Sequence, residues 1–402
     1  MSIKGNARPC VFMEPLWAVP HTLFFGYMTL YMLEFGVTLT QVGMITSLGM
    51  VVHILFALIS PYVTDKIGRR YTSLIFDITS WGITMLIWAA AQNIYYFFIA
   101  AFTNATLRIV SNSWQCLMLE DSEPEVRIHI FNFLQMAMII AGFFTPIGAL
   151  LINRLTLVPA MRIMFVFGFI SMMTMFIVRH FLTKETSVGL QKIEEMKGVG
   201  FRDVFKTYTP VLKRMAKDKM LILTLFLRSL NFTQLTIRQT FLAVLVTRRL
   251  GFTAEVMAVF LSLNAVVMLL VLLFITPILA KFTGRWPISL GIWAHIVATI
   301  VLLLSPPHSY PLLILSAVLI ALGTAIATPR IDALVANTIV NDERSVANAI
   351  VAVLILVLSA PFGFIGGVLS EIDARLPFLL TFSIFLVCLL LLRIATRVEK
   401  AS

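Results

Sequence analysis

The chain has 402 residues, of which 59% are hydrophobic and only 13% charged, and its formal net charge is +11. Soluble domains usually carry about 25% charged residues, so this composition, with a mean hydropathy of +0.94, excludes a soluble enzyme. The basic excess predicts membrane orientation rather than nucleic-acid binding, because Lys and Arg collect in the cytoplasmic loops of membrane proteins.

Apolar runs recur along the chain, and each is long enough to cross a bilayer as a helix. They predict twelve membrane-spanning helices in two sets of six. The first set covers 14–36, 39–60, 72–91, 94–118, 129–152 and 161–182. The second set covers 220–246, 253–276, 287–305, 311–334, 345–369 and 377–396. The expected fold is an all-α polytopic membrane protein.

One long polar stretch separates the two sets of spans. It divides the chain into an N-terminal six-helix bundle (1–182), a cytoplasmic linker (183–219) and a C-terminal six-helix bundle (220–402). We expect the linker to contain an amphipathic helix.

The distribution of basic residues predicts that both chain termini are cytoplasmic. In that orientation the outer loops hold only Arg154, Arg162, Arg248, Arg249 and Arg375. The other loop and terminal Lys and Arg residues then face the cytoplasm, as the positive-inside rule requires. We expect a multi-pass protein of the plasma or bacterial inner membrane.

Two charged loops repeat one pattern. The segment SPYVTDKIGRRYTSL (60–74) aligns without gaps to TPILAKFTGRWPISL (276–290). The identical pairs include Pro61 with Pro277, Gly68 with Gly284 and Arg69 with Arg285. The two halves therefore look like pseudo-symmetric copies of one six-helix unit, which is a common plan of transporters.

The first loop resembles the signature of the major facilitator superfamily between helices two and three, G-x-L-A-D-R-x-G-R-R/K. Asp65, Gly68, Arg69 and Arg70 match it, whereas Ser60 stands where the first glycine is usual. The span count, linker and repeat also fit, so the resemblance covers essentially the whole chain. It implies a secondary active transporter that works by alternating access, moves a small molecule and uses an ion gradient, expected to be that of protons.

The resemblance also implies a role for the charged loop. Asp65, Gly68, Arg69 and Arg70 would form a cytoplasmic latch between the halves, with acidic partners in Glu120 and Asp121. An arginine fork holds carboxylates well. The alternative is that these charges only fix topology, since exposed ion pairs contribute little. The second copy has Lys281 in place of Asp65, so the latch is predicted to be asymmetric and to depend on Asp65.

A second, partial resemblance concerns the direction of transport. Antiporters of this superfamily carry G-x-x-x-G-P-x-x-G-G in span five, and Gly142, Pro146, Gly148 and Ala149 match it, with Thr145 at the glycine before proline. The match favours efflux. Close helix packing and a proline kink explain the same residues without antiport.

Polar residues follow one face of span four. Asn104, Arg108, Ser111 and Gln115 recur at helical spacing, with Asn112 beside them. In the superfamily spans one, four, seven and ten line a central cavity, so we expect this face to line it, with Arg108 near mid-membrane. The alternative is that Arg108 pairs inside its own bundle.

Spans seven and ten offer matching candidates. Arg228, Asn231, Gln234 and Arg238 share one face of span seven, although Arg238 could instead snorkel to the outer surface. Span ten adds Thr324, Thr328, Arg330 and Asp332. Arg330 and Asp332 are either a gate pair or boundary charges.

A proton-driven carrier needs a group that titrates during its cycle. Glu34 and Asp77 are the acidic candidates in the spans. Each also has a structural interpretation, Glu34 as an interface residue beside Gly36 and Asp77 as a partner for basic residues of the loop.

The candidate cavity holds more arginine than acid, which favours an anionic or amphipathic organic solute. We therefore predict proton-coupled efflux of such a solute by a monomer that is not an enzyme and needs no cofactor, metal or nucleic acid. The alternatives are proton-coupled uptake of a small metabolite such as an organic acid or sugar, a flippase-like lipid carrier, and a non-transporting receptor.

Overall fold

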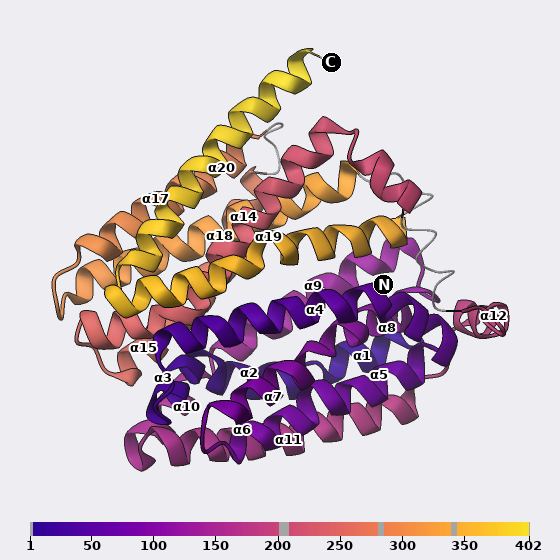
Figure 1. Cartoon of the computed structure of the whole chain (residues 1–402), viewed down its shortest axis with the longest axis horizontal. Helices are drawn as coiled ribbons and strands as arrows, with labels where there is room; N and C mark the ends of the chain where they lie inside the picture. Colours follow the sequence, from indigo (N-terminus) through magenta and orange to yellow (C-terminus); the bar gives the residue numbers. More distant parts are fainter. Residues whose placement is uncertain (1–2, 201–208, 280–284, 339–343, 402) are drawn as a thin grey trace. The chain divides into compact units, whose positions relative to one another are not determined.

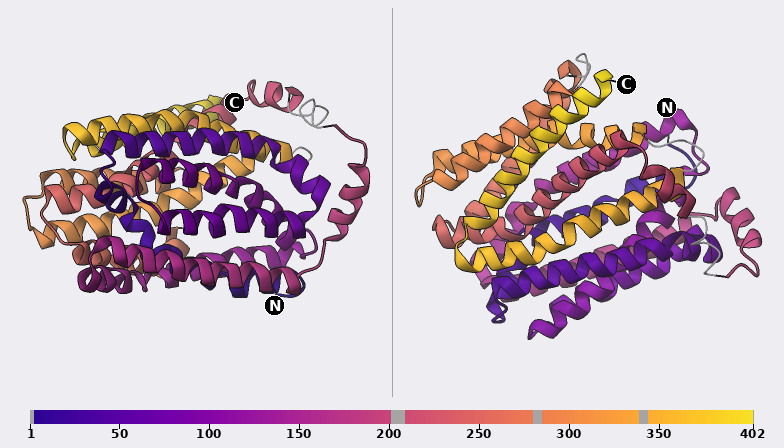
Figure 2. Two further views of the ribbon diagram at one scale, coloured as in Figure 1. Left: turned by 60° about the horizontal axis from the view of Figure 1, so that its bottom comes forward. Right: turned by 45° about the horizontal axis from the view of Figure 1, so that its top comes forward.

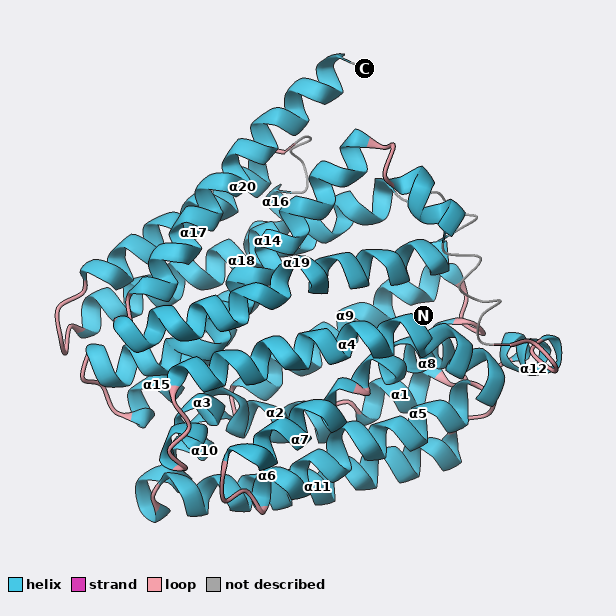
Figure 3. Cartoon of the chain, in the orientation of Figure 1, coloured by secondary structure: helices cyan, strands magenta, loops and turns pink. Residues whose placement is uncertain are grey.

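The computed structural model describes residues 3–200, 209–279, 285–338 and 344–401. These residues form helices joined by loops, and no strand occurs among them (Figure 3). Within this part of the chain, eleven helices are long and apolar enough to cross a membrane. The predicted all-α fold class is confirmed, and most predicted spans agree with the observed helices to within a few residues.

The first predicted span, 14–36, is not one continuous helix. It consists of α2 (Pro15–Phe24), a 3₁₀ turn over Phe25–Tyr27, and α3 (Met28–Glu34). Gly26 lies in the turn, and a glycine inside a helix lowers its stability. The segment is therefore absent from the eleven long helices, and it supplies the twelfth crossing only if its pieces act together.

The described chain forms two compact units. Unit 1 comprises Met1–Phe25, Glu34–Gly36 and Leu48–Thr207, and unit 2 comprises Gly26–Leu33, Val37–Ser47 and Tyr208–Ser402. The long helix α4 (Leu39–Ile67) contributes to both (Figure 1).

Unit 1 contains the other helices of the N-terminal half. They are α1 (Ala7–Met13), α5 (Arg69–Asp77), α6 (Thr84–Ala89), α7 (Ile94–Ala105), α8 (Leu107–Leu119), α9 (Pro124–Gly142), α10 (Thr145–Leu155), α11 (Leu157–Leu182) and α12 (Ser187–Glu195). Helix α11 packs against α2, α6 and α10, and α5 packs against α8. Helix α12 lies within the predicted linker.

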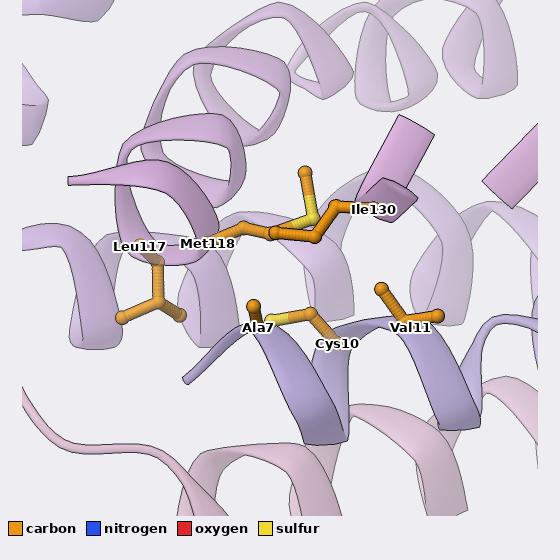
Figure 4. Close-up of a cluster of buried hydrophobic side chains, with 6 residues drawn as sticks. All are labelled: Ala7, Cys10, Val11, Leu117, Met118 and Ile130. Carbon is orange, nitrogen blue, oxygen red and sulfur yellow. The ribbon is translucent and has the colours of Figure 1, made fainter. Parts of the chain in front are cut away.

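The short helix α1 is held by apolar contacts with α8 and α9. Figure 4 shows the cluster, which contains Ala7, Cys10, Val11, Leu117, Met118 and Ile130. Burial raises the pKa of the Cys10 thiol to about 11, so the thiol stays protonated and packs as a small apolar group. The cluster fixes the end of α8 that precedes Glu120.

Unit 2 contains the helices of the C-terminal half (Figure 2). They are α14 (Lys219–Val244), α15 (Ala254–Leu270), α16 (Thr276–Leu279), α17 (Trp286–Leu304), α18 (Tyr310–Thr338), α19 (Arg344–Ile372) and α20 (Leu376–Ala401). Helix α14 contacts α18, α19 and α20, and α17 packs against α18 and α20. This arrangement brings the polar face of α14 against α18.

Within unit 2, the first part of α4 approaches α19 very closely. A Cβ atom at Gly43 would lie 2.5 Å from the Gly363 carbonyl oxygen and 2.9 Å from the Gly367 Cα. The Ser47 hydroxyl donates a hydrogen bond to the Ala360 carbonyl. Small residues allow two helix backbones to meet in this way.

Candidate functional site

The charged loop turns sharply at Gly68, between α4 and α5. Gly68 has a φ of 96°, a backbone conformation that residues with a side chain rarely adopt. A Cβ atom there would also lie 2.7 Å from Oε2 of Glu185. Both the turn and the neighbouring carboxylate therefore require glycine.

Arg69 has two acidic neighbours, and it holds them differently. Its Nε lies 3.1 Å from both carboxylate oxygens of Glu120, and its Nη2 donates to Oε1 at 3.0 Å. Its Nη1 lies 2.9 Å from Oδ1 of Asp65 but makes no hydrogen bond. Because Arg69 is only 3% exposed and charge-assisted forks are the stronger contacts, Glu120 is its principal partner.

Glu185, at the start of the predicted linker, completes this cluster. Its carboxylate accepts hydrogen bonds from the backbone N–H groups of Arg69 at 2.9 Å and Arg70 at 3.0 Å. These are the first amides of α5, which have no partner within the helix, and the helix dipole favours an acid there. Arg70 donates from Nε to the His180 carbonyl at 2.9 Å.

Neighbouring hydroxyls tie the same segment to the other two acids. The Thr186 hydroxyl donates to Glu120, and the Ser187 hydroxyl donates to Oδ1 of Asp121 at 2.8 Å. All six predicted latch residues thus lie together inside unit 1, joined by Glu185. Sequence reasoning missed Glu185 because nothing in its spacing relates a linker acid to a loop far earlier in the chain.

The second copy of the loop is only partly described. Lys281 and Gly284 lie outside the described residues, and Arg285 points Nη2 at the Met220 sulfur at 3.4 Å.

The polar face of span four makes several contacts within unit 1. Asn104 donates to the Ser80 carbonyl at 2.9 Å, and Asn112 donates to the Thr64 hydroxyl at 3.1 Å. Ser111 donates back to the Leu107 carbonyl at 2.9 Å, and Gln115 is exposed. Asn104 and Asn112 therefore brace α7 and α8 against neighbouring helices.

Arg108 differs from these neighbours. Its Nε is buried without a hydrogen-bond partner, and no carboxylate pairs with it among the residues that the structure describes. A charge at membrane depth is costly unless a partner or water meets it.

In unit 2, the polar face predicted for α14 lies against α18, which corresponds to span ten. Asn231 donates to the Thr328 hydroxyl at 3.3 Å, and Gln234 donates to Oδ1 of Asn231 at 3.2 Å. Nearer the start of α14, Arg228 Nε lies 3.0 Å from Oδ1 of Asp332. Because the helices run antiparallel, the polar positions of α14 and α18 pair in reverse order.

Asp332 therefore pairs with Arg228 and not with Arg330. The Arg330 guanidinium instead donates from Nη1 to the Ile326 carbonyl of its own helix at 2.9 Å.

Arg238 points toward α17 and α18. Its Nη2 donates to the Thr324 hydroxyl at 3.3 Å, and its Nη1 donates to Nδ1 of His295 at 3.4 Å. His295 is 1% exposed and stacks on Phe385. The sequence carries no signal for His295, because a single histidine in an apolar helix is usually a packing residue.

The two acidic proton candidates have different surroundings. Asp77 is 3% exposed and pairs with Arg179 of α11. Glu34 is exposed at the end of α3.

Comparison with known proteins gives one family. The model of the Major Facilitator Superfamily matches residues 18–245 and 225–402. A Bacillus subtilis (strain 168) relative, the uncharacterized MFS-type transporter YqjV, is 26% identical over 113 residues. That alignment covers 28% of this chain and 27% of the relative, so the match spans about a quarter of the relative's length.

Solved structures of the same fold cover nearly the whole chain. The nucleoside transporter NupG superposes with a TM-score of 0.70 at 12% identity, over 99% of this chain and 100% of NupG. The human organic anion transporter MFSD10 (TETRAN) superposes with a TM-score of 0.66 at 16% identity, over 97% and 100% of the two chains. The chain belongs to the Major Facilitator Superfamily and is a multi-pass membrane transporter of that type.

Proposed function

We propose that this transporter moves a small organic anion across the membrane by alternating access. The observation that carries the proposal is a contrast among its intramembrane arginines. Arg179 and Arg228 each pair with an aspartate, whereas Arg108 and Arg238 pair with no carboxylate among the described residues. An anionic solute bound at either arginine would supply the missing negative charge there, which offsets the cost of a cation in the membrane.

The chemistry of the guanidinium narrows the solute class. Its planar fork matches carboxylate, sulfonate or phosphate groups and also stacks on aromatic rings. This favours an amphipathic organic anion over an inorganic ion. One solved structure of the same fold, the human organic anion transporter MFSD10 (TETRAN), supports this choice.

Proton coupling and the direction of transport belong to the same proposal. The partial antiporter signature favours efflux. Within this signature, a Cβ atom at Gly148 would lie 2.5 Å from the Leu23 carbonyl oxygen. That close contact explains the small residue by packing alone. Uptake of a metabolite anion is the second candidate, favoured by the Arg238–His295 contact.

The proposed mechanism uses the predicted domain plan. The bundles 1–182 and 220–402 would move about the linker 183–219, with both termini in the cytoplasm. The cluster of Asp65, Arg69 and Glu120 would act as the latch, aided by Asp121 and Arg70.

A melting-shift screen tests the proposal on purified protein. Organic anions are compared with neutral and cationic analogues, and saturation at 100 times Kd should stabilise the protein by about 2.7 kcal/mol. The shift should be lost in Arg108→Ala and kept in Arg154→Ala, because Arg154 is exposed at the end of α10. Stabilisation by cations, or an unchanged shift in Arg108→Ala, would contradict an anion site at Arg108.

Counterflow in proteoliposomes under an imposed pH gradient gives the direction. Efflux by antiport accumulates the anion on the side that protons leave, whereas cotransport accumulates it on the side that protons enter. Liposomes without protein correct for passive diffusion of the neutral acid.

A further inference from the structure

Arg238, His295 and Thr324 form a polar cluster between α14, α17 and α18 of unit 2. Arg238 donates to the Thr324 hydroxyl at 3.3 Å and to Nδ1 of His295 at 3.4 Å. His295 is 1% exposed, whereas Arg238 is partly exposed. The guanidinium is therefore the more exposed of the two groups.

The contact fixes the protonation state of the imidazole. A guanidinium can only donate hydrogen bonds, so Nδ1 of His295 must be the acceptor and carries no hydrogen. The ring is then neutral, with its hydrogen on Nε2. This Nε2 atom is buried and has no hydrogen-bond partner. The ring plane is held by Phe385, which stacks on it at 4.9 Å with an interplanar angle of 5°.

A second proton on the ring would break this contact. Protonation at Nδ1 turns the acceptor into a donor, so Arg238 and His295 could no longer share a hydrogen bond. Two positive groups would then lie 3.4 Å apart, and their repulsion would release the guanidinium. An anion near Arg238 would remove the repulsion and stabilise the protonated ring.

Among the residues that the structure describes, no acid contacts this cluster. The neighbouring helices contribute Gly323 and Thr324 from α18 and Phe385 from α20. Arg238 of α14 is the charged group whose field reaches His295 within the described part of the chain. The two acidic candidates differ, since Asp77 is held by Arg179 and Glu34 lies exposed.

We propose that His295 is the proton-binding residue of this transporter and that its protonation frees Arg238 to bind the anionic solute. This inference rests on the proposed function, because it requires an anion as the solute. The proton from solution forms the Nδ1–H bond, and the hydrogen bond from Arg238 Nη1 to Nδ1 breaks. Proton and anion then bind together, which predicts cotransport, as in the second candidate of the proposed function, and not exchange.

Nitrogen NMR of the full chain with labelled histidine, in lipid nanodiscs, reads the ring directly. At about pH 8 the His295 signals should show the neutral ring with hydrogen on Nε2, and at about pH 5 with p-aminohippurate both nitrogens should be protonated. His295→Gln assigns the signals. If that variant does not fold, the signals are assigned from their shift in Arg238→Gln. A ring that stays neutral at both pH values overturns the proposal.

Uptake of radiolabelled p-aminohippurate into proteoliposomes measures the coupling. Uptake by the wild type should rise by up to about tenfold per unit of pH lowered on the anion side, as expected for one required proton. His295→Gln should hold uptake at the low level that the wild type shows at high pH and should lose this dependence, because glutamine can accept from Arg238 as the neutral ring does and cannot be protonated. The control His308→Gln alters a histidine of the 305–309 loop and should keep the wild-type dependence.

The outcomes separate the two proposals. Full pH dependence in His295→Gln overturns the proton assignment and leaves the anion transporter intact. If the wild type moves neither p-aminohippurate nor any anion of the screen, the proposed function fails, and the NMR titration alone decides whether His295 binds a proton.

Discussion

At the scale of single residues, the latch cluster contains two carboxylates that interact with Arg69 to different extents. Glu120 forms a fork with Arg69 and is 16% exposed, whereas Asp65 is 29% exposed and makes no hydrogen bond to the guanidinium. Sequence reasoning assigned the main role to Asp65, since it is the residue that the second copy of the loop lacks. The observed geometry instead places most of the interaction at Glu120.

This inequality predicts different costs for two matched substitutions. Glu120→Gln removes the charge that neutralises a buried arginine and should destabilise the protein by about 3–5 kcal/mol. Asp65→Asn removes a partly exposed ion pair and should cost about 0–1 kcal/mol. Thermal unfolding of both variants in one detergent measures the difference. Equal losses, or a larger loss for Asp65→Asn, would restore Asp65 as the main partner of Arg69.

The sequence predicted those parts of the site that follow a local period. Helical spacing placed Asn231, Gln234 and Arg238 on one face of a helix, but it did not predict that this face contacts Thr328 and Thr324 of span ten. It did not reveal His295 or Glu185, because each acquires its partner only through tertiary packing. A residue with no periodic neighbours and a distant partner leaves no pattern in a single sequence.

At the scale of elements, hydropathy predicted helix positions well but not helix continuity. Apolar length alone fixes where a span lies, so both ends of α17 and the first residue of α18 fall within one residue of their predicted spans, and α18 ends four residues beyond its own. The break at Phe25–Tyr27 and the π-helical turns Ile78–Ile83 and Leu245–Arg249 depend on local hydrogen bonding. Such irregularities have no counterpart in the hydropathy of the sequence, so hydropathy did not predict them.

The contact between α4 and α19 gives a second prediction. Gly43→Ala places a Cβ atom 2.5 Å from a backbone oxygen of α19, and because backbone cannot move aside cheaply, we expect a loss of about 1–3 kcal/mol. Gly49→Ala on the same helix meets its nearest neighbour at 3.9 Å and should be neutral or stabilising by up to about 1 kcal/mol. Melting temperatures test this, and equal shifts would show that the close contact is not needed for stability.

At the scale of the whole molecule, the interrupted first span decides the topology. Eleven long helices alone would place the termini on opposite sides of the membrane, whereas a twelfth crossing returns them to the same side. The stretch from Pro15 to Glu34 covers about 30 Å if it is helical throughout, which is enough to cross a bilayer core. The basic residues of the loops favour the same-side arrangement with both termini in the cytoplasm.

Terminal epitope tags test this parity directly. With twelve crossings, protease added to inside-out vesicles should remove both tags, and protease added to right-side-out vesicles should remove neither. An epitope inserted in the loop 306–309 is the internal control and should show the opposite pattern. Because each crossing reverses the side of the chain, removal of one terminal tag from each vesicle type would mean that α2 and α3 do not cross together. The two halves would then not be copies of one six-helix unit, whatever the similarity of their loops.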